Sequence, residues 1–206
     1  MGKFQVKVRN IDDDTLYTHK TIKLGSKSID TPCKAISIGK STKKDNIAEE
    51  ARGFNEHFFQ VDKDGLEEAQ RSHDANLQKN IGRSLNKGRR DEFNVVFVNY
   101  QSIGHLSREN LNYLADLIYS TSDFFTVPLM PELLTKVKED GKGTASSHFD
   151  TYLNNIKNFI KVARQINGKP IMGVIPSMPR IFINKIIDLY INEASKPTAS
   201  ILLEEL

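Results

Sequence analysis

Two side chains that could do acid–base chemistry follow predicted buried strands in this sequence. His105 comes shortly after the run "NVVFVNY", and Glu132 follows the run "DFFTVPLM" on an expected proline-flanked loop. An imidazole and a carboxyl group that approach each other at neighbouring strand ends can act as acid and base. Glu132 and His105 are therefore the candidate catalytic residues. His105 equally fits a structural role, at the approach to a helix that Ser107 can cap.

Other polar residues at the same strand ends are candidates for substrate binding. Asn99 and Gln101 lie at the end of the run 94–100, and Ser177 follows the run 170–176. Ser177 has no adjacent base in the sequence that would make it a nucleophile, so it is assigned to binding.

Basic residues suggest an anionic partner without demanding one. The net charge is +3 and the sequence pI is near 8.8. Lys40, the pair Arg89-Arg90 and Arg180 are candidates for binding nucleic-acid phosphate. Each of these cations equally fits a solvated surface.

The elements that must position these residues are clearest after residue 94. Continuous apolar runs at 94–100, 123–129 and 170–176 alternate with amphipathic helical patterns that start near Ser107, Ser146 and Arg180. Strands that are apolar on both faces and alternate with helices are typical of parallel βα units. Gly168 is expected to end the second helix.

Residues 1–32 differ in kind, because their apolar and polar residues alternate around turns at "DDD" and Gly25-Ser26. This pattern predicts a small antiparallel β-structure. Two further strands are expected at 33–39 and 57–62, and helical composition marks 64–85.

No glycine-rich phosphate loop follows any of the predicted strands. "GKGTASS" (141–147) has suitable letters, but it lacks the required spacing and the strand before it. The absence of a phosphate-binding loop favours a barrel over a nucleotide-binding open sheet. The predicted fold class is α/β, a partial (β/α) TIM-type barrel preceded by the antiparallel β-structure. We expect one domain, with βα units over 33–196 and a tail at 197–206 too short for another unit.

Several stretches then suggest a family. They are the opening "FQVKVRNIDDDTLYTHKTIKLGSKSIDTPCKAISIG" with its Thr31-Pro32 step, the run "STSDFFTVPLMPE", and "YLNNIKNFIKVARQINGKPIMGVIPSMPRIFINKIIDLYINEA" with Gly173-Val174. Together they resemble the barrel of tRNA-guanine transglycosylases, especially the archaeosine type.

The resemblance implies a (β/α)8 barrel that exchanges a guanine in RNA for a 7-deazaguanine. In that family a carboxylate attacks the ribose C1′ and a covalent glycosyl-enzyme forms. A second carboxylate acts in proton transfer, and polar groups at strand ends read the base edge. A sister group acts on DNA.

The sequence departs from the family at the residues that do this chemistry. The early Asp-Ser-Gly-Gly motif is missing, "VNYQSIGH" stands nearest to it, and Val127 to Met130 replace a base-reading Asp. The base-reading Gln falls on Pro176, and the nucleophilic Asp is expected beyond Leu206. Asp123 lies at the far end of its strand from the site. We therefore expect the isolated chain not to exchange guanine.

Length and composition limit the expected assembly, metal content and location of the chain. The chain has 206 residues, whereas an eight-fold barrel needs about 250, so a homo-oligomer or a second polypeptide is expected to complete the barrel. Cys33 is the single cysteine, which excludes the family's zinc site and an internal disulfide. No cofactor or metal is expected. A signal peptide and a membrane-spanning run are not recognised, so the expected location is the cytoplasm.

Two further classes of function stay open. One is a non-catalytic binding or assembly subunit built on the same half-barrel. The other is an unrelated small-molecule barrel enzyme, although no predicted strand ends in a lysine poised for a Schiff base.

Overall fold

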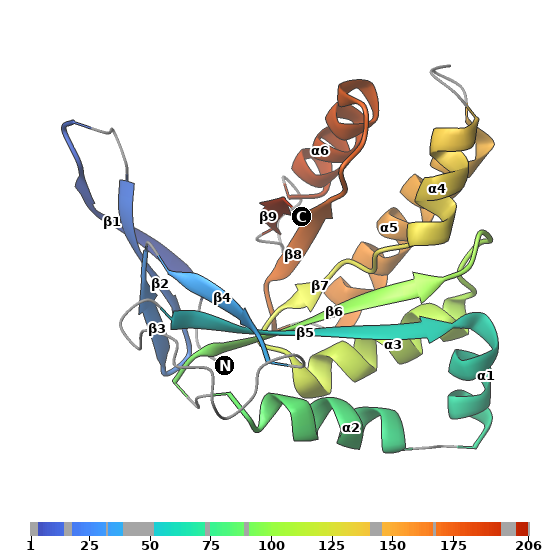
Figure 1. Cartoon of the computed structure of the whole chain (residues 1–206), viewed down its shortest axis with the longest axis horizontal. Coiled ribbons are helices and arrows are strands. Elements are labelled where there is room, and N and C mark those ends of the chain that lie inside the picture. The colour runs from blue at the N-terminus through green and yellow to red at the C-terminus, as the bar shows by residue number, and fades with distance from the viewer. Residues whose placement is uncertain are drawn as a thin grey trace.

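The computed structural model describes residues 4–14, 18–31, 33–38, 52–72, 75–88, 91–140, 146–166, 168–194 and 201–205. In these ranges the chain forms a mixed α/β fold with six helices and three three-stranded sheets, none of which closes on itself (Figure 1).

The N-terminal sheet is antiparallel, as predicted. Strands β1 (Gln5–Ile11), β2 (Thr18–Leu24) and β3 (Lys27–Asp30) pair in chain order. The tight turn between β2 and β3 contains Gly25, whose φ of +61° lies in the left-handed region that favours glycine.

The other two sheets are parallel. One contains β4 (Lys34–Ser37), β5 (Arg52–Asp62) and β6 (Phe93–Gln101), and the other contains β7 (Phe125–Thr126), β8 (Ile171–Ile175) and β9 (Ile201–Glu205). A parallel bridge between Asn99 and Leu129 joins β6 to the segment after β7, and Tyr100 N donates to Leu129 O at 2.7 Å. The parallel strands therefore neighbour one another in chain order.

Helices connect these strands. Helices α1 (Lys63–Arg71) and α2 (Asn76–Leu85) precede β6, and α3 (Arg108–Thr121) follows it. Helices α4 (Pro131–Glu139) and α5 (Ser147–Ile166) lie between β7 and β8, and α6 (Arg180–Ala194) follows β8. Ser107 Oγ accepts from Asn110 N and caps α3, as expected. The prediction of consecutive parallel βα units between 94 and 195 is confirmed.

Two expectations about which elements form were wrong, and two strand boundaries differ, since β5 begins at Arg52 and β7 covers only Phe125–Thr126. The stretch after Pro128 is helix α4 rather than a loop, because Pro131 suits a first helical turn and Leu133, Leu134 and Val137 are buried on one side. The tail also contains a strand, since β9 pairs in parallel with β8 from Ile171↔Ile201 onward and α6 supplies the crossover. A five-residue strand needs far less chain than the full unit that was expected.

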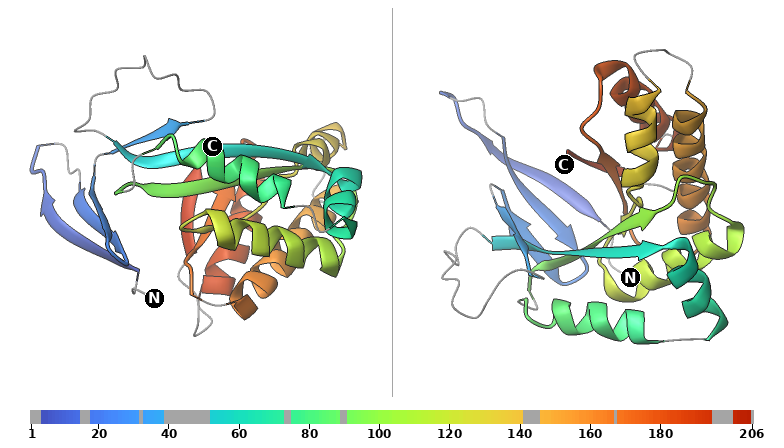
Figure 2. Two further views of the ribbon diagram at one scale, coloured as in Figure 1. Left: turned by 90° about the horizontal axis from the view of Figure 1, so that it is seen from below. Right: turned by 45° about the vertical axis from the view of Figure 1, so that its right-hand side comes forward.

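The parallel strands have an outer face against the helices and an inner face turned away from them. Val98, Phe125 and Ile171 pack on the outer face with α3, α5 and α6. Inner-face residues form a separate cluster, Phe93, Val95, Phe97, Phe124, Met172 and Val174, which Ile29 of β3 joins. The antiparallel sheet thus lies against the amino-end part of the inner face (Figure 2).

An ion pair joins the antiparallel sheet to the parallel strands. Lys27 Nζ lies 2.5 Å from Asp123 Oδ2, and the same oxygen accepts from Asn94 N at 2.7 Å. Asp123 therefore has a structural role just before β7, at the end of the strands opposite to their carboxyl ends.

Candidate functional site

Side chains of β5 and β6 form a ladder on the inner face. The register pairs Phe58 with Phe97 and Gln60 with Asn99. Alternate residues of a strand share a face, so Glu56 of β5 and Gln101 of β6 belong to the same ladder. Two of the predicted binding residues, Asn99 and Gln101, are thus neighbours on one face.

An aromatic pair lies in the middle of this ladder. The rings of Phe58 and Phe97 stack with centroids 5.0 Å apart and an interplanar angle of 18°. Phe97 is buried, whereas Phe58 is 41% exposed. The inner face therefore offers an aromatic surface that a planar ligand can reach.

Asn99 presents a hydrogen-bond acceptor without a donor. Its Oδ1 atom is buried and has no hydrogen-bond partner among the described residues. A buried polar atom left unpaired costs about 1–3 kcal/mol, and a ligand that donates a hydrogen bond relieves this cost. The amide therefore suits an N–H donor, such as one on a base edge.

Glu56 is the carboxyl group on this part of the inner face. It is half-buried, and its carboxyl makes no hydrogen bond or ion pair with any residue that the structure describes. Burial raises the pKa of Glu56 above its ordinary value. A raised pKa means that this carboxyl group keeps its proton to a higher pH than a free glutamate does, so it can exchange a proton with a ligand. The sequence prediction missed Glu56 because it began this strand at 57, although Phe54 and Phe58, two residues to either side of Glu56, already mark one face of a strand.

A pocket of 400 Å³ opens at the carboxyl end of β5 and β6. Its lining includes Gln60, Asp62 and Gln101, together with Phe59, Val61, Gly65 and Leu77. Asp62 Oδ1 accepts from Gly65 N at 2.7 Å and caps α1, so that oxygen is engaged. Gln60 and Gln101 remain as the amides that a ligand at this edge would meet.

The two candidate catalytic residues do not contact each other. His105 is exposed in the loop between β6 and α3, and Glu132 is exposed in the first turn of α4. No hydrogen bond or ion pair joins them within the described part of the chain. The His105 loop is held in place by Asn155 of α5, which donates to Gly104 O and accepts from Leu106 N.

The remaining predicted residues lie further along the same edge or outside the described ranges. Ser177 follows β8 and Arg180 begins α6, and both are exposed. Strand β7 separates β8 from β6 in the strand order, so Ser177 is not adjacent to Asn99. Lys40, Arg89 and Arg90 lie outside the described residues.

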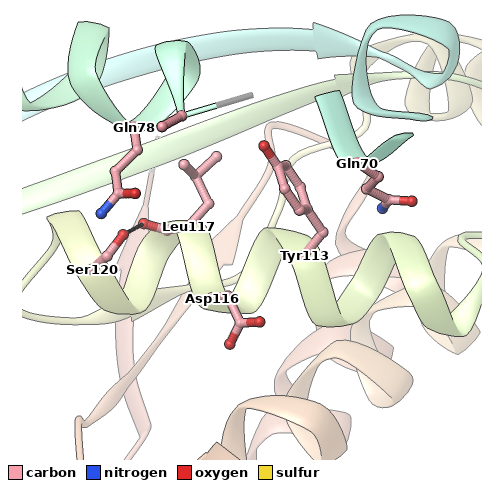
Figure 3. A pocket seen from close by; sticks show the side chains of 7 residues that line it. Gln70, Gln78, Tyr113, Asp116, Leu117 and Ser120 are labelled. Carbon is pink, nitrogen blue, oxygen red and sulfur yellow. Dashed lines mark hydrogen bonds between the residues drawn. The ribbon is translucent and has the colours of Figure 1, made fainter. Parts of the chain in front are cut away.

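A larger pocket of 580 Å³ lies on the helical side of the strands. Figure 3 shows Gln70 from the end of α1, Gln78 from α2, and Tyr113, Asp116, Leu117 and Ser120 from α3 in its lining. Ala75, just before α2, also lines it. Among the residues that the structure describes, none of the predicted site residues lines this pocket, and Asp116 is the one charged group in its lining. It is a weaker candidate than the inner face.

Across the ranges that the structure covers, no three His, Cys, Asp or Glu side chains gather as a metal site would require. Over those same ranges, every helix is too short or too polar to cross a bilayer.

Comparison with known proteins gives no relative: no family profile, no curated protein and no solved structure matches the chain.

Proposed function

We propose that the inner face binds a purine nucleobase and that the chain forms part of a tRNA-guanine-transglycosylase-like (β/α) barrel. The observation that carries the proposal is the exposed ring of Phe58, stacked on Phe97, beside the unpartnered Oδ1 of Asn99. Base–aromatic stacking contributes about 1–3 kcal/mol, and an amide beside it can read the base edge.

In this proposal each inner-face group has a defined role. Phe58 stacks on the base, Asn99 accepts a hydrogen bond from a ring N–H or amino group, and Gln101 contributes a second amide. Glu56 supplies the carboxyl group that exchanges a proton with the base. Glu132 and His105 stay candidates for a catalytic role only if a bound nucleic acid brings them together.

The chain order of the parallel strands supports the barrel part of the proposal. Strands that follow one another in this way, with helices on the outside, are the arrangement of a (β/α) barrel. Strands β4 and β9 each have one unpaired edge within the described ranges. Open edges of parallel strands need cover, so we propose that strands of a second copy or of another polypeptide complete the barrel.

The proposal is tested by binding of guanine and 7-deazaguanine to the purified chain, measured by saturation-transfer NMR and equilibrium dialysis. Phe58→Ala is expected to weaken binding about tenfold or more. Asn99→Leu is expected to weaken binding without lowering the free energy of unfolding, because it removes an unpaired buried acceptor.

The matched control is Ile191→Ala, which removes an exposed side chain on α6 and is expected to leave binding unchanged. Binding that is absent in the unaltered chain, or equal in all four proteins, overturns the proposal.

A further inference from the structure

A groove with a strong positive bias runs along the antiparallel sheet. It has a volume of 410 Å³, and its lining is Lys7, Val8 and Arg9 of β1 with Thr21 and Lys23 of β2. Three of the five described lining residues are cations. None of the basic residues singled out from the sequence is among them.

The strand register directs these cations away from the core. Lys7 pairs with Thr21, whereas Ile22 pairs with Ile29, which joins the apolar cluster of the inner face. Neighbouring residues of a strand point to opposite faces, so Lys7, Thr21 and Lys23 lie on the face opposite to the apolar one. The pairing shifts between Val8 and Asn10, and Arg9 lies at this irregularity, on the side of Thr21.

Arg9 is oriented by its neighbours. Its Nε donates to Thr21 Oγ1 at 2.5 Å, and the same hydroxyl donates to Asp30 Oδ1 at 2.6 Å. Arg9 Nη2 also lies 3.5 Å from Asp30 Oδ1. Thr21 is buried, so this arrangement holds the Arg9 side chain along the groove while Nη1 stays available.

The charges in the groove are not balanced. Asp30 compensates Arg9, but Lys7 and Lys23 are exposed and form no ion pair with any described residue. Two positive charges therefore face solvent side by side, next to an oriented guanidinium. A guanidinium and ammonium groups in this arrangement suit phosphate oxygens.

We propose that this groove binds the sugar–phosphate backbone of a nucleic acid. A membrane surface fits less well, because a membrane-binding face places several apolar side chains beside its cations, whereas Val8 is the one apolar residue in the described lining of this groove and Val6 lies on the opposite face from Lys7. The inference builds on the proposed function, since the backbone bound here would belong to the nucleic acid whose base enters the inner face.

The test measures binding of labelled bulk tRNA and of a short duplex DNA by fluorescence anisotropy over a series of salt concentrations. The double variant Lys7→Gln/Lys23→Gln is expected to bind about tenfold or more weakly at low salt. The slope of log K against log salt is expected to become shallower by about one for each lysine lost.

The matched control is Lys157→Gln/Lys161→Gln, which removes the same charge from exposed positions one turn apart on α5. It is expected to leave affinity and salt slope nearly unchanged. Neither pair of lysines contacts the core, so both variants are expected to fold like the unaltered chain. Circular dichroism checks this.

Equal weakening by the two double variants overturns the proposal, since it would mean that overall charge alone drives binding. Binding to vesicles of phosphatidylserine that depends on Lys7 and Lys23, without binding to nucleic acid, overturns it in favour of a membrane surface.

The base-binding variants separate this proposal from the previous one. Phe58→Ala is expected to weaken guanine binding about tenfold or more and to leave the salt-dependent anisotropy signal in place. If the chain binds guanine but Lys7→Gln/Lys23→Gln does not weaken nucleic-acid binding, only the groove proposal is contradicted. If the lysine variant weakens nucleic-acid binding but the chain does not bind guanine, only the nucleobase site is contradicted.

Discussion

The ring of Tyr190 lies directly against Gly173. Its hydroxyl donates to Val174 O at 3.0 Å and accepts from Val174 N at 3.2 Å, so the side chain of α6 satisfies both backbone groups of one β8 residue. A Cβ atom at position 173 would lie 2.9 Å from the ring of Tyr190. Both residues are buried, so a methyl group added at position 173 would press on the ring.

Gly173→Ala is therefore expected to lower the free energy of unfolding by about 1–3 kcal/mol, the usual range for overpacking a core. Urea unfolding followed by circular dichroism measures the change. The matched substitution is Gly82→Ala in α2, where nothing lies within 4 Å of the new Cβ. That change is expected to stabilise the chain by up to about 1 kcal/mol. Destabilisation of equal size at both positions would contradict the packing argument.

The ion pair between Arg164 and Glu193 gives a second prediction. Arg164 Nη1 lies 2.6 Å from Glu193 Oε2, and the two side chains are only 13% and 3% exposed. Removing one partner of a buried pair leaves the other charge unpaired, so Glu193→Gln is expected to destabilise the chain by about 3–5 kcal/mol. Thermal unfolding provides the measurement.

Glu139→Gln is the control for this pair, because Lys136 and Glu139 form an exposed ion pair on α4 at 2.7 Å. Exposed pairs contribute at most about 1 kcal/mol, so this change is expected to be small. Similar losses of stability in Glu193→Gln and Glu139→Gln would show that burial does not strengthen the ion pair between α5 and α6.

Stability is expected to depend on pH through Glu56. Because burial raises the pKa of this carboxyl, the folded chain favours the protonated form. The stabilising contribution is fully present below the ordinary pKa of glutamate and is lost as the pH rises through the raised value. Glu56→Gln is therefore expected to stabilise the chain at neutral pH and to make no difference at acidic pH.

The effect of Glu56→Gln is expected to stay below about 1 kcal/mol, because the side chain is only half-buried and solvent screens it. Urea unfolding at several pH values measures it, with the exposed Glu132→Gln as a control. A gain that is the same at every pH would mean that charge burial at Glu56 is not its cause.

Much of the parallel framework could be predicted from the sequence, because its strands are continuous apolar runs. Residues 94–100 were predicted as a strand, and β6 covers Phe93–Gln101. Helix α4 and strand β9 were missed for a common reason. Pro131 and the short run "ILLEE" resemble loop and tail locally, and only their tertiary neighbours, the core around Leu133 and the edge of β8, make them regular.

The site was predictable only in part. Asn99 and Gln101 were found because strand ends are a general location for binding groups. Phe58 and Glu56 were missed because their role depends on the register of β5 against β6, which pairs Phe58 with Phe97. Register is set by pairing across 39 residues of chain, from Phe58 to Phe97, and no local pattern specifies it.

Base exchange gives the last prediction. The purified chain alone is expected not to incorporate labelled guanine or 7-deazaguanine into tRNA or duplex DNA. Displacing a base needs a carboxylate held within bonding reach of C1′ and shielded from water. Glu132 is exposed on α4, and the ring of Phe58 beside Glu56 is open to solvent. Incorporation that Glu56→Gln or Glu132→Gln abolishes would contradict this expectation and identify the carboxyl group that the reaction needs.

Pairing in chain order also bears on how the molecule folds. Phe125 pairs with Ile171 and Ile171 with Ile201, so the two pairings span 46 and 30 residues of chain. Contacts of this separation are non-local, and parallel pairing across them is a slow step of folding, because loop entropy is lost before the contact forms. During synthesis on the ribosome, the newest strand therefore keeps one edge unpaired until the next unit is complete. A chain that stalls between two units would expose that edge, which is a template for pairing with another chain.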